Sequence, residues 1–96
     1  METKSRNPGY IDDKEALLHR TRRIAGQVGG IERMIEEERY CIEILTQISA
    51  IQAALDKVAV GLLDNHARHC VIEASAANRE EKTEEMMGAV ARLLRS

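Results

Sequence analysis

Large aromatic side chains are scarce in this sequence, and neither sign of charge is in strong excess. It contains no Phe, no Trp and two tyrosines, Tyr10 and Tyr40. Proteins that bind single-stranded nucleic acid usually stack the bases on aromatic rings, so that class of function is not expected. Fourteen Lys and Arg residues against sixteen Asp and Glu residues give a formal net charge of -2. Any binding of nucleic acid must therefore come from a local basic patch.

Long apolar runs are also absent. No stretch approaches the roughly 20 apolar residues of a membrane span, and the polar N-terminus lacks the apolar core of a signal peptide. A cytoplasmic protein is therefore expected. In that reducing compartment Cys41 and Cys70 are more plausible as thiols or metal ligands than as a disulfide. A chain of 96 residues fits one small domain, without a separate catalytic domain, so we do not expect an enzyme.

Helical periodicity begins after the first eleven residues. Residues 1–11, with Pro8-Gly9, show no period and predict a flexible tail, followed by a single domain over residues 12–96. Apolar residues then recur at helical spacing and predict a first helix over about residues 13–38. These apolar positions are Leu17, Ile24, Val28, Ile31 and Ile35.

A second and longer helix is predicted over about residues 40–73. Its apolar positions alternate steps of three and four, as in a heptad repeat, at Cys41, Ile44, Ile48, Ile51, Leu55, Val58 and Leu62. Such a helix would be roughly 50 Å long, which exceeds what the core of a 96-residue monomer can cover. The sequence therefore predicts an oligomer.

A third, short helix is predicted near the C-terminus. Asn78 and Glu81 have the spacing of a capping pair, and an apolar face follows. No strand pattern is found, so the fold class is all-α: a three-helix subunit with a long second helix. The apolar face consists of Met86, Met87, Val90, Leu93 and Leu94.

A candidate metal site follows from the spacing of His66 and Cys70. Four residues apart on one helix, their side chains project from the same face. Cys41 would lie about 38 to 43 Å away on a straight helix, too far to join them within one chain. In an antiparallel dimer, Cys41 of one subunit would instead lie opposite residues 66 to 70 of the other. Two-fold symmetry then creates two equivalent shared sites.

Two thiolates and one imidazole are soft ligands that suit Cu(I), or Zn(II) if a fourth ligand such as water is added. The lack of an obvious fourth ligand favours Cu(I). The residues alone leave open a second interpretation, in which both cysteines are small buried hydrophobes and His66 is an ordinary histidine.

The densest basic segment is His19-Arg20-Thr21-Arg22-Arg23, in which Arg20 and Arg23 share a helix face. Phosphates are the natural partners of such a cluster. Basic runs are more often simply solvated, however, and no helix-turn-helix pattern accompanies this one. The segment alone therefore does not decide whether the protein binds DNA.

The sequence over roughly residues 14 to 94 resembles the CsoR/RcnR family of all-helical bacterial metal- and stress-sensing repressors, with greatest similarity to its copper-sensing branch. The resemblance implies an antiparallel helical-bundle dimer that assembles into a dimer of dimers. It also implies that the metal-free protein binds double-stranded operator DNA. Binding of Cu(I) would release the DNA, so that copper-resistance genes are derepressed. The residues that carry the resemblance are Arg20, Gly26-Gln27, Tyr40-Cys41, Gln47-Ile48-Ser49-Ala50, His66 and Cys70.

Individual roles are implied by the same resemblance. Cys41, His66 and Cys70 match the trigonal Cu(I) ligands, and Tyr40 and Glu85 match positions around the site that link it to the bundle. The DNA-binding positions implied by the resemblance and by the basic run are Arg20, Arg22, Arg23, Gln27 and Lys57.

Other members of the family sense other signals. Nickel and cobalt sensors carry His where this chain has Cys70, persulfide sensors lack the His, and formaldehyde sensors use an N-terminal Pro where this chain has Glu2. The assignment to the copper-sensing branch therefore depends on Cys70. The alternatives are a sensor of one of these other signals, a copper buffer without DNA binding, and a thiol redox sensor that does not need His66.

Overall fold

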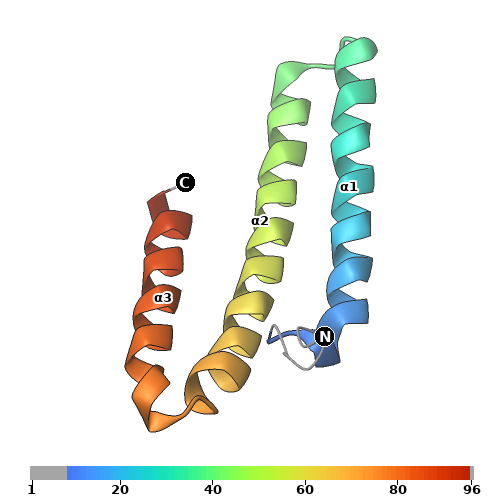
Figure 1. The fold of residues 1–96 in the computed structure, drawn as a ribbon. Coiled ribbons are helices and arrows are strands. Elements are labelled where there is room, and N and C mark those ends of the chain that lie inside the picture. Colours follow the sequence, from blue (N-terminus) through green and yellow to red (C-terminus); the bar gives the residue numbers. More distant parts are fainter. Residues whose placement is uncertain (1–8, 96) are drawn as a thin grey trace. The chain divides into compact units, whose positions relative to one another are not determined.

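The computed structural model describes residues 9–95, which are almost entirely helical (Figure 1). This part of the chain contains no strand, which confirms the predicted all-α class with three main helices. None of its helices is both long enough and apolar enough to cross a membrane. In chain order the elements are the 3-10 helix η2 (Ile11–Asp13), α1 (Lys14–Glu36), α2 (Cys41–His66), the π-helix η3 (Ala67–Ile72) and α3 (Ala76–Arg95).

The helix boundaries agree with the apolar periodicity more closely than with the predicted caps. The first predicted helix corresponds to α1, and the predicted helix over residues 40–73 corresponds to α2 followed by η3. The capping pair Asn78 and Glu81 was wrong, because Asn78 already lies inside α3. The backbone N–H groups of Asn78 and Arg79 both donate to the Ser75 carbonyl at 3.0 Å, so the helix starts earlier.

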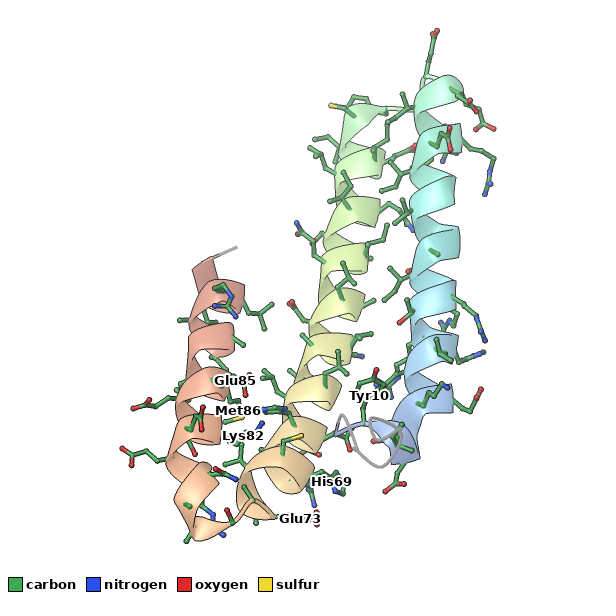
Figure 2. The ribbon with its side chains drawn as sticks, viewed as in Figure 1. Tyr10, His69, Glu73, Lys82, Glu85 and Met86 are labelled. Atoms are coloured by element: carbon green, nitrogen blue, oxygen red, sulfur yellow. The ribbon has the colours of Figure 1, made fainter. Side chains whose placement is uncertain are left out.

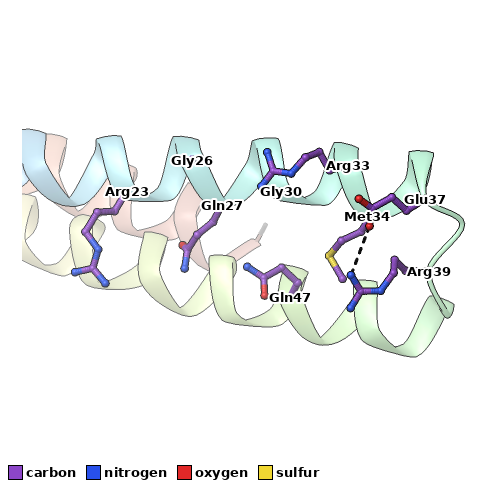
Figure 3. A pocket seen from close by; sticks show the side chains of 9 residues that line it. All are labelled: Arg23, Gly26, Gln27, Gly30, Arg33, Met34, Glu37, Arg39 and Gln47. Atoms are coloured by element: carbon purple, nitrogen blue, oxygen red, sulfur yellow. Dashed lines mark ion pairs between the residues drawn. The ribbon is translucent and has the colours of Figure 1, made fainter.

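The chain divides into two compact units, which we describe separately: Asp13–Val60, and Gly61–Ser96 together with Met1–Asp12. In Asp13–Val60, α1 and α2 run antiparallel and side by side (Figures 1 and 3). Ile24 of α1 and Ile51 of α2 are buried there. Much of the apolar surface of α2 stays exposed in the single chain, which identifies a face that another chain can cover. Exposed apolar residues of α2 in this unit are Ile42, Leu45, Leu55 and Val60.

In the second unit, α3 packs against η3. Val71 is buried, and the Arg79 guanidinium closes the end of the π-helix by donating from Nη2 to the carbonyls of Ile72 and Ala74, both at 3.1 Å. The predicted tail covers residues 1–11, and residues 1–8 of it lie outside the described residues. Gly9, the first described residue, is buried in this unit.

The turn between α1 and α2 is a Schellman motif without glycine. The Arg39 N–H donates to Met34 O at 2.9 Å and the Glu38 N–H donates to Ile35 O at 3.0 Å. This pattern places Glu38 in the left-handed region, at φ 57, where glycine is usually found. The position costs a residue with a Cβ about 1–2 kcal/mol. Glu38 also adds negative charge at the C-terminal end of the helix dipole, where it is unfavourable.

We expect Glu38→Gly to stabilise the protein by about 0.5–1 kcal/mol, because glycine relieves the left-handed strain and removes the carboxylate, partly offset by the backbone entropy of glycine. Chemical denaturation at fixed protein concentration measures the change. Glu36→Gly, the same substitution at the last residue of α1, is the matched control and should destabilise. Equal destabilisation by both substitutions would contradict the strain argument.

Candidate metal site and basic groove

His66 and Cys70 lie where α2 changes from an α-helix into a π-helix. His66 is the last residue of α2, and Cys70 belongs to η3. Just before the change, the buried side chain of Asn65 donates from Nδ2 to Gly61 O at 2.9 Å. Such bonds to the carbonyl four residues earlier perturb the helix locally. π-helical turns are uncommon and occur frequently at functional sites, so this is the point in the second unit where ligand chemistry is expected.

Gly9 lies directly against these two residues. A Cβ atom placed on Gly9 would be 3.1 Å from Cys70 Sγ, 3.4 Å from His66 Cα and 3.6 Å from Asn65 O. Gly9 also has a φ of +111, a conformation that residues with a side chain rarely adopt. Both the backbone conformation and the short distance to the thiol therefore require glycine at this position.

Cys41 is the first residue of α2 and is exposed, whereas Cys70 is partly buried. Both cysteines are free thiols. Within residues 9–95 of a single chain, no three His, Cys, Asp or Glu side chains are grouped so that they could hold a metal ion. The three predicted ligands Cys41, His66 and Cys70 therefore do not form such a group within residues 9–95 of one chain, and their role as ligands remains a prediction.

The donor chemistry of these residues fits a soft metal ion. Two reduced thiols and an imidazole can form a low-coordinate N/S set, and neither sulfur is used in a disulfide. His66 is only partly exposed, and it forms no ion pair among the described residues. The set is suited to Cu(I) once Cys41 is brought to the pair.

The residues predicted to surround the site, Tyr40 and Glu85, have other neighbours in the described chain. The Tyr40 side chain is 71% exposed, while its carbonyl accepts the N–H groups of Glu43 and Ile44 at the start of α2. Glu85 on α3 lies 4.0 Å from Lys82 (Figure 2). Their proposed role around the metal remains a prediction.

Nδ1 of His69 in η3 lies 3.7 Å from Oε1 of Glu73, the residue that follows η3 (Figure 2). The side chain of His69 is 25% exposed, so it is more covered than a freely solvated histidine. This pairing gives His69 a partner of its own next to the candidate ligands.

A basic groove lies between α1 and α2 in the unit Asp13–Val60. Arg20, Arg23 and Gln27 of α1 and Lys57 of α2 line a hollow of about 480 Å³. The side of this hollow formed by α2 has mostly small side chains, those of Ala50, Ala53 and Ala54. Four of the five predicted DNA-binding residues are therefore gathered in one place. Arg22 is exposed but does not line this groove, since it is two residues from Arg20 on the helix.

Residues 13–92 match the family described as metal-sensitive transcriptional repressors. The chain belongs to this family. Within it, the chain is 50% identical over 91 residues to the copper-sensing transcriptional repressor RicR of Mycobacterium tuberculosis, covering 92% of this chain and 95% of RicR. It is 49% identical over 73 residues to the copper-sensing repressor CsoR of Bacillus subtilis, covering 76% of this chain and 72% of that one.

A solved structure of a copper-sensing repressor is also similar to this chain. The fold is similar to the crystal structure of the copper-sensing repressor CsoR with Cu(I) from Geobacillus thermodenitrificans NG80-2, with a TM-score of 0.79 and 44% identity. The match covers 86% of this chain and 88% of the other. The resemblance to the copper-sensing branch of the family is thereby confirmed.

Three features of the site were not predicted from the sequence of this family member: Gly9, Asn65 and the π-helix. Pro8-Gly9 indicated a turn, but nothing local shows that Gly9 packs on residues more than fifty positions later. Asn65 is a polar residue directly before His66, and its burial could not be inferred from periodicity. An α-helix and a π-helix differ in hydrogen-bond register, and that difference leaves little trace in apolar spacing.

We expect Gly9→Ala to raise the rate at which the Cys70 thiol is alkylated, by about threefold or more. The added Cβ cannot occupy its ideal position 3.1 Å from Cys70 Sγ, and φ +111 disfavours alanine, so the segment must move off the thiol. Peptide mapping of metal-free protein during alkylation measures both cysteines, and Cys41 serves as the internal reference. Unchanged Cys70 reactivity in Gly9→Ala would show that the contact does not protect the thiol.

Proposed function

We propose that this chain is a Cu(I)-responsive transcriptional repressor that binds operator DNA without metal and releases it on binding Cu(I), so that copper-resistance genes are expressed. The observation that carries this proposal is the complete set of Cys41, His66 and Cys70 in a member of the metal-sensitive repressor family. The identity of 50% to a copper-sensing repressor supports the choice of metal. A cytoplasmic location follows from this function.

The proposed metal site is shared between two subunits. Since α2 begins at Cys41 and ends at His66, two copies of α2 packed antiparallel bring Cys41 of one chain near the His66 and Cys70 pair of the other. The exposed apolar residues of α2 supply the surface that such a dimer buries. A dimer of dimers is the proposed assembly on DNA.

Cu(I) would supply a soft, low-coordinate centre that links the sulfur atoms of Cys41 and Cys70 to the imidazole of His66. Cys70 discriminates against nickel and cobalt, which favour nitrogen and oxygen ligands over a second thiolate. Packing of Gly9 against Cys70 keeps this sulfur partly covered in the single chain.

The basic groove is the proposed DNA contact. Arg20, Arg23 and Lys57 are exposed cations that can each contact a phosphate, and Gln27 adds a neutral donor beside them. Because the protein has a net charge of -2, this local patch must supply the electrostatic attraction. Arg22 lies outside the groove, and its contribution rests on the sequence alone.

Release of DNA requires that Cu(I) bind the DNA-free form more tightly than the DNA-bound form. A hundredfold difference corresponds to a coupling free energy of about 2.7 kcal/mol, within the ordinary range for allosteric proteins. Affinity for Cu(I) and coupling to DNA are separate quantities, so different ligands can dominate each. The thiolates should supply most of the affinity. The second ring nitrogen of His66 can hydrogen-bond outward, toward Tyr40 or Glu85 of the assembly, and carry the coupling.

We expect the wild-type protein to bind the promoter of its own operon without metal, and anaerobic Cu(I) to weaken that binding by about a hundredfold. His66→Ala should still bind Cu(I) but remain on the DNA when Cu(I) is added. Cys41→Ser and Cys70→Ser should lose tight Cu(I) binding itself. Competition titration measures the affinity for Cu(I), and fluorescence anisotropy measures DNA binding.

Two outcomes would contradict this account. A wild-type protein that binds Cu(I) but never binds the promoter would be a copper buffer. Normal DNA release by His66→Ala on addition of Cu(I) would refute the division of roles among the three ligands while leaving the repressor function intact.

A further inference from the structure

A second hollow, of about 590 Å³, continues the basic groove along α1 and α2 toward the turn that joins them (Figure 3). Arg23 and Gln27 line both hollows, so the two form one continuous surface within the unit Asp13–Val60. Beyond these shared residues the second hollow adds Arg33 and Arg39, neither of which was among the predicted DNA-binding residues.

The two added arginines differ in their ion pairs. Arg39 Nε lies 3.0 Å from Glu43 Oε1, and its Nη1 lies 3.7 Å from Glu37 Oε1 (Figure 3 shows the second pair). Two carboxylates therefore balance the charge of Arg39. The exposed guanidinium of Arg33 forms no ion pair with any described residue, so its positive charge is available to an anionic partner.

Two glycines form part of the surface beside Arg33. Gly26 and Gly30 line the hollow, and a Cβ at Gly26 would meet nothing within 4 Å. A Cβ at Gly30 would meet only Arg33 Nη2, at 3.8 Å. The guanidinium thus lies beside the bare backbone of Gly30, where a bulky polymer backbone can approach closely.

The wall contributed by α2 is polar or small. Gln47 lines the second hollow, and Ala50, Ala54 and Lys57 continue the same helical face along the first. Exposed apolar residues such as Leu45 and Leu55 are not among those that line either hollow. A second copy of the chain can therefore bury the apolar side of α2 while the hollows stay open.

We propose that Arg33 contacts a DNA phosphate beyond those reached by Arg20, Arg23 and Lys57, and that Arg39 does not. The inference rests on the proposed repressor function and extends its DNA surface along α1. Arg20 and Arg33 are thirteen residues apart, or about 20 Å along a helix. That is the length of about six base pairs of double-stranded DNA, so the two residues can contact separate phosphates.

The test is the salt dependence of binding to the promoter of the protein's own operon, measured by fluorescence anisotropy on the full-length, metal-free protein. Each lost phosphate contact lowers the slope of log K against log salt by about one for each subunit that contacts DNA. Arg33→Gln should lower the slope by this amount, as should the positive control Arg20→Gln. Arg33→Lys, which keeps the charge, should retain the wild-type slope.

Arg39→Gln is the matched control, because it removes an arginine from the same hollow whose charge is already balanced. It should leave the slope unchanged. Sedimentation of every variant checks that the oligomer is intact, and Cu(I) competition should give wild-type affinity for Arg33→Gln.

A wild-type slope for Arg33→Gln, with a reduced slope for Arg20→Gln, would overturn the inference and leave the proposed function standing. An equal reduction by Arg39→Gln would also overturn it, since the effect would then not depend on an unpaired charge. Failure of the wild-type protein to bind the promoter would instead overturn the proposed function.

Discussion

One geometric constraint underlies the proposed metal site: the length of α2 separates Cys41 from His66. The helix begins at Cys41 and ends at His66, and no three-ligand group is found among residues 9–95 of one chain. A site that uses both thiols therefore needs a second subunit. Metal binding and assembly are then linked, because anything that binds the assembled form stabilises that form. In the proposed dimer, the same constraint would allow a bound metal ion to influence how the two subunits are arranged.

The composition of α2 allows this one helix to contribute residues to several different surfaces. Its apolar residues are too numerous for the small core of a single chain, in which Ile51 is the one apolar residue of this helix that is buried. Its alanines and Lys57 line the basic groove beside α1 with small side chains and one cation. Gly61 and Asn65 lead into the π-helical turn that carries Cys70. The proposed dimer contact, the proposed DNA contact and the predicted ligands thus fall on different faces and ends of one element.

The sequence predicts the helices well, because apolar periodicity is a local signal that the fold preserves. The closeness of His66 and Cys70 was predictable for the same reason, since a spacing of four fixes a shared face, whereas their role as ligands remains a prediction. Features that depend on contacts between distant residues were not predictable. Gly9 against Cys70 is one example, and the gathering of Lys57 with Arg20 is another, for which only the family resemblance gave a signal. Glu38 at positive φ and the π-helix depend on hydrogen-bond register, which composition does not report.

Mixing two inactive variants tests the shared site most directly. Cys41→Ala and Cys70→Ala should each lack tight Cu(I) binding, but a heterodimer of the two contains one intact site. After subunit exchange in an equal mixture, random pairing should restore about a quarter of the wild-type Cu(I) stoichiometry. The measurement is anaerobic Cu(I) titration of the exchanged mixture, with native mass spectrometry to confirm the heterodimers. Confirmed heterodimers without tight Cu(I) binding would contradict a site built from two subunits.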